Sequence, residues 1–168
     1  GATAVGYASV SGGLLNSGHI AGQTAVSISR ATLSGGVINS GSIVGGLFGI
    51  SLATEGLIDG VLNNSGAIIG NTAIEIAAST ISGGINNSGV ISGFAGTAIQ
   101  ITGTSPTVEI QNTGTIIGAI NGAANVTNAG LFALQSISGV AGTIVGGSVV
   151  NSTIVGNFTQ GAGGTLQI

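Results

Sequence analysis

The side chains that could carry acid–base chemistry are few: four carboxylates and one imidazole. They are Glu55, Asp59, Glu75, Glu109 and His19. Hydrolysis of a glycosidic bond uses two carboxyl groups about 5–10 Å apart. Such a pair would require Glu75 to meet Glu55 or Asp59, and no Lys, Arg or His stands beside these acids in the sequence. Acidic side chains are mostly solvated surface groups, so we expect no catalytic residue among them.

Nucleophilic and metal chemistry lack partners in this sequence. His19 is the single histidine and Cys is absent, which excludes a zinc site. Ser17 and Ser40 recur as part of a repeated turn, and a Ser–His mechanism needs a partnered histidine. The segment "GAGGT" (161–165) has the glycines of a phosphate loop but no following Lys. We therefore expect no cofactor, no cofactor-binding residue and no metal site.

Charge is nearly absent, and this limits the partners of the chain. Arg30 is the single basic residue, the formal net charge is −3, and charged residues make up 3% of the 168 residues. Ordinary globular proteins contain about 25%. Binding to nucleic acid requires a basic patch for the phosphates, so we expect no nucleic-acid partner.

The remaining composition favours a folded extracellular chain. Hydrophobic residues make up 43% of the sequence, which is too many for a disordered chain. Gly, Ser and Asn interrupt every apolar run before the roughly 20 residues that a membrane helix needs. The absence of Cys is compatible with an extracellular protein without disulfides. No basic leader is present, so we expect a mature or internal fragment whose targeting signal has been removed.

One phrase recurs along the chain, for example "GGVINSGSIVGG" (35–46) and "GGINNSGVISG" (83–93). Its Asn residues serve as anchors: Asn16, Asn39, Asn64, Asn87, Asn112, Asn128 and Asn151. The differences between successive anchor numbers are 23, 25, 23, 25, 16 and 23. A period in this range is typical of solenoids, propellers and repeat arrays.

Aligned on the anchors, the columns alternate as in a strand. The position two residues before the anchor is always apolar: Leu14, Val37, Leu62, Ile85, Ile110, Val126 and Val149. The position four residues after it forms the predicted core stack: Ile20, Ile43, Ile68, Ile91, Ile116, Phe132 and Val155. The position directly before the anchor is mixed, and Leu15, Ile38 and Val150 are its candidate exposed apolar residues. Even offsets therefore face inward and odd offsets outward. Gly two residues after most anchors suggests a bend with positive φ.

Each unit offers further β-like pieces, such as "TAIEI" (72–76) and "STISGG" (79–84), separated by Gly-rich corners. The abundance of Gly and β-branched residues argues against helices. The sequence thus predicts an all-β, single-domain parallel β-helix (β-solenoid) over residues 1–168, with three strands per coil and about seven coils. The anchor amides would stack as a structural ladder. The shorter interval between Asn112 and Asn128 predicts a short coil in which a corner or strand is trimmed.

With these columns, the chain resembles the passenger regions of bacterial autotransporters, and more loosely the β-helical secreted adhesins of Gram-negative bacteria. The resemblance rests on the iterated "NSG-x-I-x-G" phrase across residues 14–156 and on the ending "GNFTQGAGGTLQI" (156–168). It implies a right-handed, three-sided β-helix outside the cell, tethered by an outer-membrane translocator that is absent from this chain. Thr153 in the glycine column and Asn157, where most coils have Gly, depart from the pattern. Passengers include adhesins, aggregation factors, toxins and enzymes, so no specific activity follows.

The expected function lies in the surface of the rod. With so little charge, neighbouring rods repel one another weakly, and the ends of a β-helix are unpaired edges. The first hypothesis is a structural, self-associating extracellular solenoid, a fibre, surface-layer or cell-aggregation module, whose partners are other copies bound end to end or laterally. The second is a monomeric adhesin that binds a cell-surface ligand through its outer face. The third is a polysaccharide-cleaving enzyme. The first is preferred because the sequence shows neither a loop insertion nor a cluster of aromatic residues for a ligand.

Overall fold

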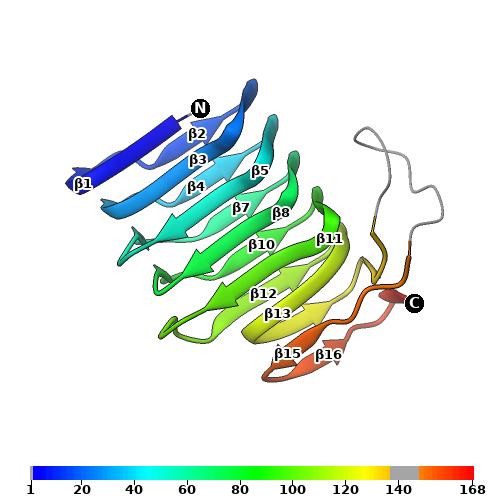
Figure 1. Cartoon of the computed structure of the whole chain (residues 1–168). Helices are drawn as coiled ribbons and strands as arrows, with labels where there is room; N and C mark the ends of the chain where they lie inside the picture. Colours follow the sequence, from blue (N-terminus) through cyan, green and yellow to red (C-terminus); the bar gives the residue numbers. More distant parts are fainter. Residues whose placement is uncertain (1, 137–147) are drawn as a thin grey trace.

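The computed structural model shows an all-β chain whose parallel strands stack into a β-solenoid of about five turns (Figure 1). It describes residues 2–136 and 148–168, with side chains from residue 8 onward. The strands are β1 (Ala2–Val10), β2 (Leu14–Asn16), β3 (His19–Leu33), β4 (Val37–Asn39), β5 (Ser42–Ala53), β6 (Leu57–Ile58), β7 (Leu62–Asn64), β8 (Ala67–Ala77), β9 (Thr80–Ile81), β10 (Ile85–Asn87), β11 (Val90–Thr102), β12 (Val108–Asn112), β13 (Thr115–Asn128), β14 (Leu131–Ala133), β15 (Thr153–Val155), β16 (Phe158–Gln160) and β17 (Thr165–Gln167).

A regular coil contains a three-residue strand, a long strand and a two-residue strand. In the coil made by β7, β8 and β9, β7 pairs in parallel with β4 and β10, and β8 pairs with β5 and β11. The anchors are in register, since Asn64 lies between Asn39 and Asn87. Neighbouring strands of a sheet lie about 4.8 Å apart, so equivalent residues of successive coils are in contact. This contact is the physical reason for the sequence repeat.

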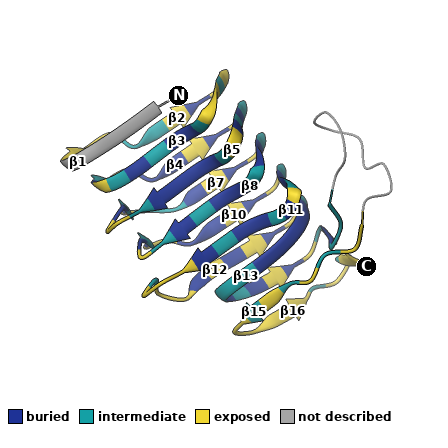
Figure 2. Cartoon of the chain, viewed as in Figure 1, coloured by how far each residue is buried: buried dark blue, intermediate teal, exposed yellow. Residues whose placement is uncertain are grey.

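The core is a set of apolar columns inside the coils (Figure 2). Ile43, Ile68, Ile91 and Ile116 are completely buried and in register with one another. Phe132 continues this column and is also buried, whereas Ile20 is partly buried and packs against the core. The inward direction of the even offsets, predicted from the repeat, is confirmed for these coils.

The glycines after the anchors have a different cause from the one predicted. None of Gly41, Gly66, Gly89, Gly114 and Gly130 has a positive φ. A Cβ at each of them would collide with the carbonyl oxygen of the equivalent glycine in the preceding coil. The column therefore requires glycine because the backbones of successive coils approach closely at this corner, and the predicted bend with positive φ is wrong.

The short coil before Asn128 is confirmed. β13 is one strand of 14 residues that replaces the several strands of a regular coil. Asn121 pairs with Gln100 of β11, and only three residues later Ala124 pairs with Val108 of β12. The two-residue strand and its corner are omitted. The direct connection bends at Gly122, whose φ is 114° and where a Cβ would collide with the Ile101 carbonyl oxygen.

The chain departs from the predicted repeat after Ala133. Gln135 and Val149 form an antiparallel bridge, and Ser136 N donates to Ser148 O at 3.0 Å, so these two segments pair antiparallel, unlike the parallel strands of the coils. This antiparallel pair was not expected from the sequence. The final coil is made by β15, β16 and β17, which pair with β13 and β14. The structure has about five turns rather than the seven expected.

Candidate functional site

The most regular polar feature of the described residues is the ladder of anchor amides inside one corner. Nδ2 of each Asn donates to Oδ1 of the Asn in the next coil, from Asn16 through Asn39, Asn64, Asn87 and Asn112 to Asn128. These five hydrogen bonds are 2.7–2.8 Å long. All six side chains are buried. The amides thus form one chain of hydrogen bonds with a single direction.

The ladder also satisfies the backbone of the corner. Each Nδ2 donates a second bond to a carbonyl oxygen of the next coil, for example from Asn39 to Ala67 O at 3.0 Å. Asn16 Oδ1, which no earlier Asn contacts, accepts from Gly18 N at 3.2 Å. Buried amides cost free energy unless their polar atoms are bonded, and aligned bonds polarise one another. The role of these Asn residues is therefore structural.

The seventh member of the ladder is Gln160, not Asn151. Asn128 Nδ2 donates to Gln160 Oε1 at 3.2 Å, and Asn151 is exposed. Val155, predicted in the core stack, is 63% exposed, and Leu166 pairs beside Phe132 in its place. Gln160 follows Asn128 by 32 residues, whereas Asn39 follows Asn16 by 23, so the frame is shifted and both predictions are wrong. The amide in "NFTQGAGG" (157–164), Gln160, could have indicated this ladder position. It was overlooked because Gln stands there instead of Asn.

The outer surface of this corner carries two columns of side chains. The column directly before the ladder contains Leu15, Ile38, Asn63, Asn86, Gln111, Thr127 and Thr159. Leu15 and Ile38 are 71% and 47% exposed and adjacent in register, as the sequence predicted; Val150, the third candidate, is half-buried and lies outside the column. The column directly after the ladder includes Ser65, Ser88 and Thr113. Between the columns runs an open groove of about 280 Å³.

The four carboxylates are dispersed over the surface. Glu75 accepts from Ser51 Oγ at 2.7 Å and is in register with Ser51 and Gln100. Glu109 accepts from Asn125 Nδ2 at 2.6 Å, and Asp59 accepts from Ser82 Oγ at 3.1 Å. Glu55 occupies a corner with φ of 64°. None of these described partners is a second carboxylate.

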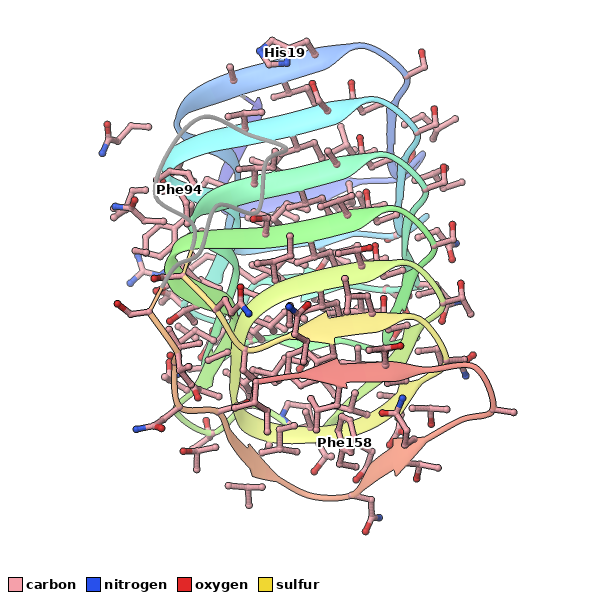
Figure 3. All side chains as sticks on the ribbon, turned by 90° about the vertical axis from the view of Figure 1, so that its right-hand side faces the viewer. His19, Phe94 and Phe158 are labelled. Carbon is pink, nitrogen blue, oxygen red and sulfur yellow. The ribbon has the colours of Figure 1, made fainter. Side chains whose placement is uncertain are left out.

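His19 lies on the outside, at the opposite end of the stack from Phe158 (Figure 3). Its Nδ1 is 2.5 Å from Ser42 Oγ on the neighbouring strand. The pair is exposed, and a Ser–His mechanism requires a third group that orients the imidazole. Among residues 2–136 and 148–168, no cluster of three His, Cys, Asp or Glu side chains is suited to a metal ion.

The same residues contain no helix long and apolar enough to cross a membrane. Comparison of the chain with models of protein families, with curated proteins and with solved structures finds no match.

Proposed function

We propose that this chain is a structural, extracellular β-solenoid that associates with copies of itself, as part of a fibre, a surface layer or a cell-aggregation module, and that it has no catalytic role. The observation that carries the proposal is the adjacent pair Leu15 and Ile38, which project outward at 71% and 47% exposure. Burying a large apolar side chain contributes about 1.5–3 kcal/mol. A second copy that covers this pair would gain part of two such contributions.

The small number of charged residues supports the same proposal. Five charged residues in 168 give little repulsion between parallel copies. Further apolar side chains, Val155, Phe158 and Leu166, are exposed on the strands of the final coil. Association can therefore proceed through lateral or end contacts without opposing charge.

The proposed location is the surface of a Gram-negative bacterium. The repeated phrase and the ending at 156–168 resemble autotransporter passengers, and the β-solenoid architecture is compatible with a β-helical passenger. In this proposal a separate outer-membrane translocator tethers the rod.

The test is sedimentation velocity over a wide range of concentration, with negative-stain electron microscopy of the same samples. We expect concentration-dependent assembly, weakened at least about tenfold in a Leu15→Ser/Ile38→Ser variant because each lost apolar contact removes more than about 1 kcal/mol. The control is Leu47→Ser, a residue of similar exposure (40%) on β5. Separate rods at every concentration would contradict the proposal.

A second candidate is a monomeric adhesin that binds a cell-surface ligand. The groove beside the amide ladder favours it, because this groove offers exposed polar side chains from three successive coils. Under this alternative the rods remain single and bind ligand at the groove.

A further inference from the structure

The groove beside the ladder has two chemically different walls that are repeated in three coils. One wall presents amides and the other presents hydroxyls: Asn63, Asn86 and Gln111 face Ser65, Ser88 and Thr113 across the buried ladder. Because successive coils lie about 4.8 Å apart, the polar part of the groove follows the rod axis for roughly 10 Å.

The hydroxyl wall offers acceptors. Ser65 Oγ donates its hydrogen to Asn39 O at 3.3 Å, Ser88 Oγ to Asn64 O at 3.5 Å, and Thr113 Oγ1 to Asn87 O at 3.4 Å. A hydroxyl has one hydrogen and two lone pairs. With the hydrogen directed to the preceding coil, the lone pairs of all three oxygens remain for a ligand.

The amide wall offers donors as well as acceptors. Asn86 Nδ2 donates to Asn63 Oδ1 at 3.2 Å. An amide has two N–H hydrogens and two carbonyl lone pairs. Within the described part of the chain, this single bond leaves the Nδ2 hydrogens of Asn63 and the Oδ1 of Asn86 available, together with the amide of Gln111.

The groove is also uncharged. Glu109 is the charged residue of β12, and its carboxylate already accepts from Asn125. A phosphate or carboxylate ligand can only accept hydrogen bonds, and an ammonium ligand can only donate them. Neither kind of ligand could therefore use both the donors of the amide wall and the acceptors of the hydroxyl wall. An extended peptide could not add to the sheet here, because β7, β10 and β12 each pair on both sides and strand addition requires a free edge.

We propose that this groove binds a neutral polysaccharide chain lying along the rod axis. Each sugar hydroxyl both donates and accepts, so it can accept from an amide on one wall and donate to a hydroxyl oxygen on the other. Ile38, at one end of the groove, offers apolar surface to the C–H face of a sugar ring. This site shares Ile38 with the self-association surface proposed above, whereas its amide and hydroxyl walls lie outside that surface.

The test is an NMR titration of the ¹⁵N-labelled chain with neutral xylo-, cello- and manno-oligosaccharides, and with an oligogalacturonate as the charged comparison. We expect saturable shifts of the side-chain amide signals of Asn86 and Gln111 with at least one neutral oligosaccharide. Asn86→Ala/Ser88→Ala should weaken that binding at least about tenfold, the effect of losing one or two hydrogen bonds.

The control is Ser27→Ala/Gln100→Ala, which removes the same chemical groups from the outer face of β3 and β11. It should leave binding unchanged. The proposal is overturned if no neutral oligosaccharide shifts these signals, if the oligogalacturonate binds equally well, or if the control reduces binding as much. Sedimentation of the same variants separates this site from self-association. If the parent chain binds no sugar and the groove variant no longer assembles, the groove is a contact between copies, and the sugar-binding proposal is overturned.

Discussion

Gly41 lies so close to Gly18 that a Cβ on Gly41 would collide with the Gly18 carbonyl oxygen. The same relation recurs at Gly66, Gly89, Gly114 and Gly130, each against the coil before it. Two residues before each of these glycines stands a member of the amide ladder, whose bonds of 2.7–2.8 Å require coils at a fixed separation. The glycine column permits the close approach and the ladder uses it, so the two columns function as one corner.

The glycine column gives the first prediction. Gly66→Ala should destabilise the fold by about 2 kcal/mol or more, because its Cβ would meet backbone atoms of Gly41 that cannot move aside without breaking the ladder. Gly18→Ala is the matched control, since a Cβ there meets nothing within 4 Å. Urea unfolding measures both, and equal free energies of unfolding for the two variants would contradict the interpretation.

The second prediction concerns the ladder and compares two neighbouring residues, Asn64 inside it and Asn63 outside it. Asn64→Ala removes the amide between Asn39 and Asn87 and leaves Asn39 Nδ2 and Asn87 Oδ1 each without one buried partner. An orphaned buried polar group costs about 1–3 kcal/mol. We expect a loss of about 2–4 kcal/mol, whereas Asn63→Ala, exposed on the outside, should change stability by about 0.5 kcal/mol or less. Similar losses at both positions in thermal unfolding would contradict a structural role for the ladder.

The regular coils could be predicted from the sequence because stacking places the same residue type at the same corner. Asn64 repeats Asn39 and Ile68 repeats Ile43 for that reason. The short coil was also predictable, since the interval between Asn112 and Asn128 is too short to contain all strands of a regular coil. Periodicity indicates where equivalent residues lie and which direction they face.

The final coil could not be predicted in the same way. The separation of 32 residues between Asn128 and Gln160 breaks the period, and Asn151 follows Asn128 at the interval of a regular coil without occupying its column. Gln160 supplies the amide because its longer side chain presents the same kind of acceptor, Oε1. The cause of the glycine column was equally hidden, because a sequence does not reveal whether a glycine is required by its φ or by a close approach of two backbones.

The corner that follows the long strands gives the third prediction. Ala78 has φ of 47°, and Arg30 and Thr54, at the same corner of the preceding coils, have φ of 50°. The left-handed region costs a non-glycine residue about 1–2 kcal/mol, whereas replacing Ala with Gly adds unfolded-state entropy worth about 0.4–1 kcal/mol. Ala78→Gly should therefore stabilise the fold by about 0.5 kcal/mol. Ala77→Gly, at the last residue of β8, should destabilise the fold, because φ of Ala77 is not positive and no strain is relieved. If Ala78→Gly proves less stable in urea unfolding, Ala78 is not strained.

A buried hydroxyl gives the fourth prediction. Ser92 is 4% exposed, lies in register between Ile69 and Ile117, and its Oγ has no hydrogen-bond partner within the described residues. Burying an unbonded hydroxyl costs about 1–3 kcal/mol, so Ser92→Ala should raise the free energy of unfolding by about 1 kcal/mol. Ser51→Ala is the control: its hydroxyl is bonded to Glu75, and its loss should lower stability. A destabilised Ser92→Ala would show that the hydroxyl has a partner after all.

Salt gives the fifth prediction, and it separates an apolar contact between copies from an electrostatic one. Raising NaCl from about 0.1 to 1 M shortens the Debye length from about 10 to 3 Å, which would dissolve an assembly held by exposed ion pairs. Copies that meet through Leu15 and Ile38 bury no charge, so their association measured by sedimentation velocity should change less than about twofold. Sodium sulfate, which strengthens apolar burial, should increase it. The variant Arg30→Gln tests for assembly held by ion pairs, because Arg30 is the single basic residue of the chain. If this variant, or the parent chain in 1 M NaCl, no longer assembles, the contact between copies is electrostatic and does not depend on Leu15 and Ile38.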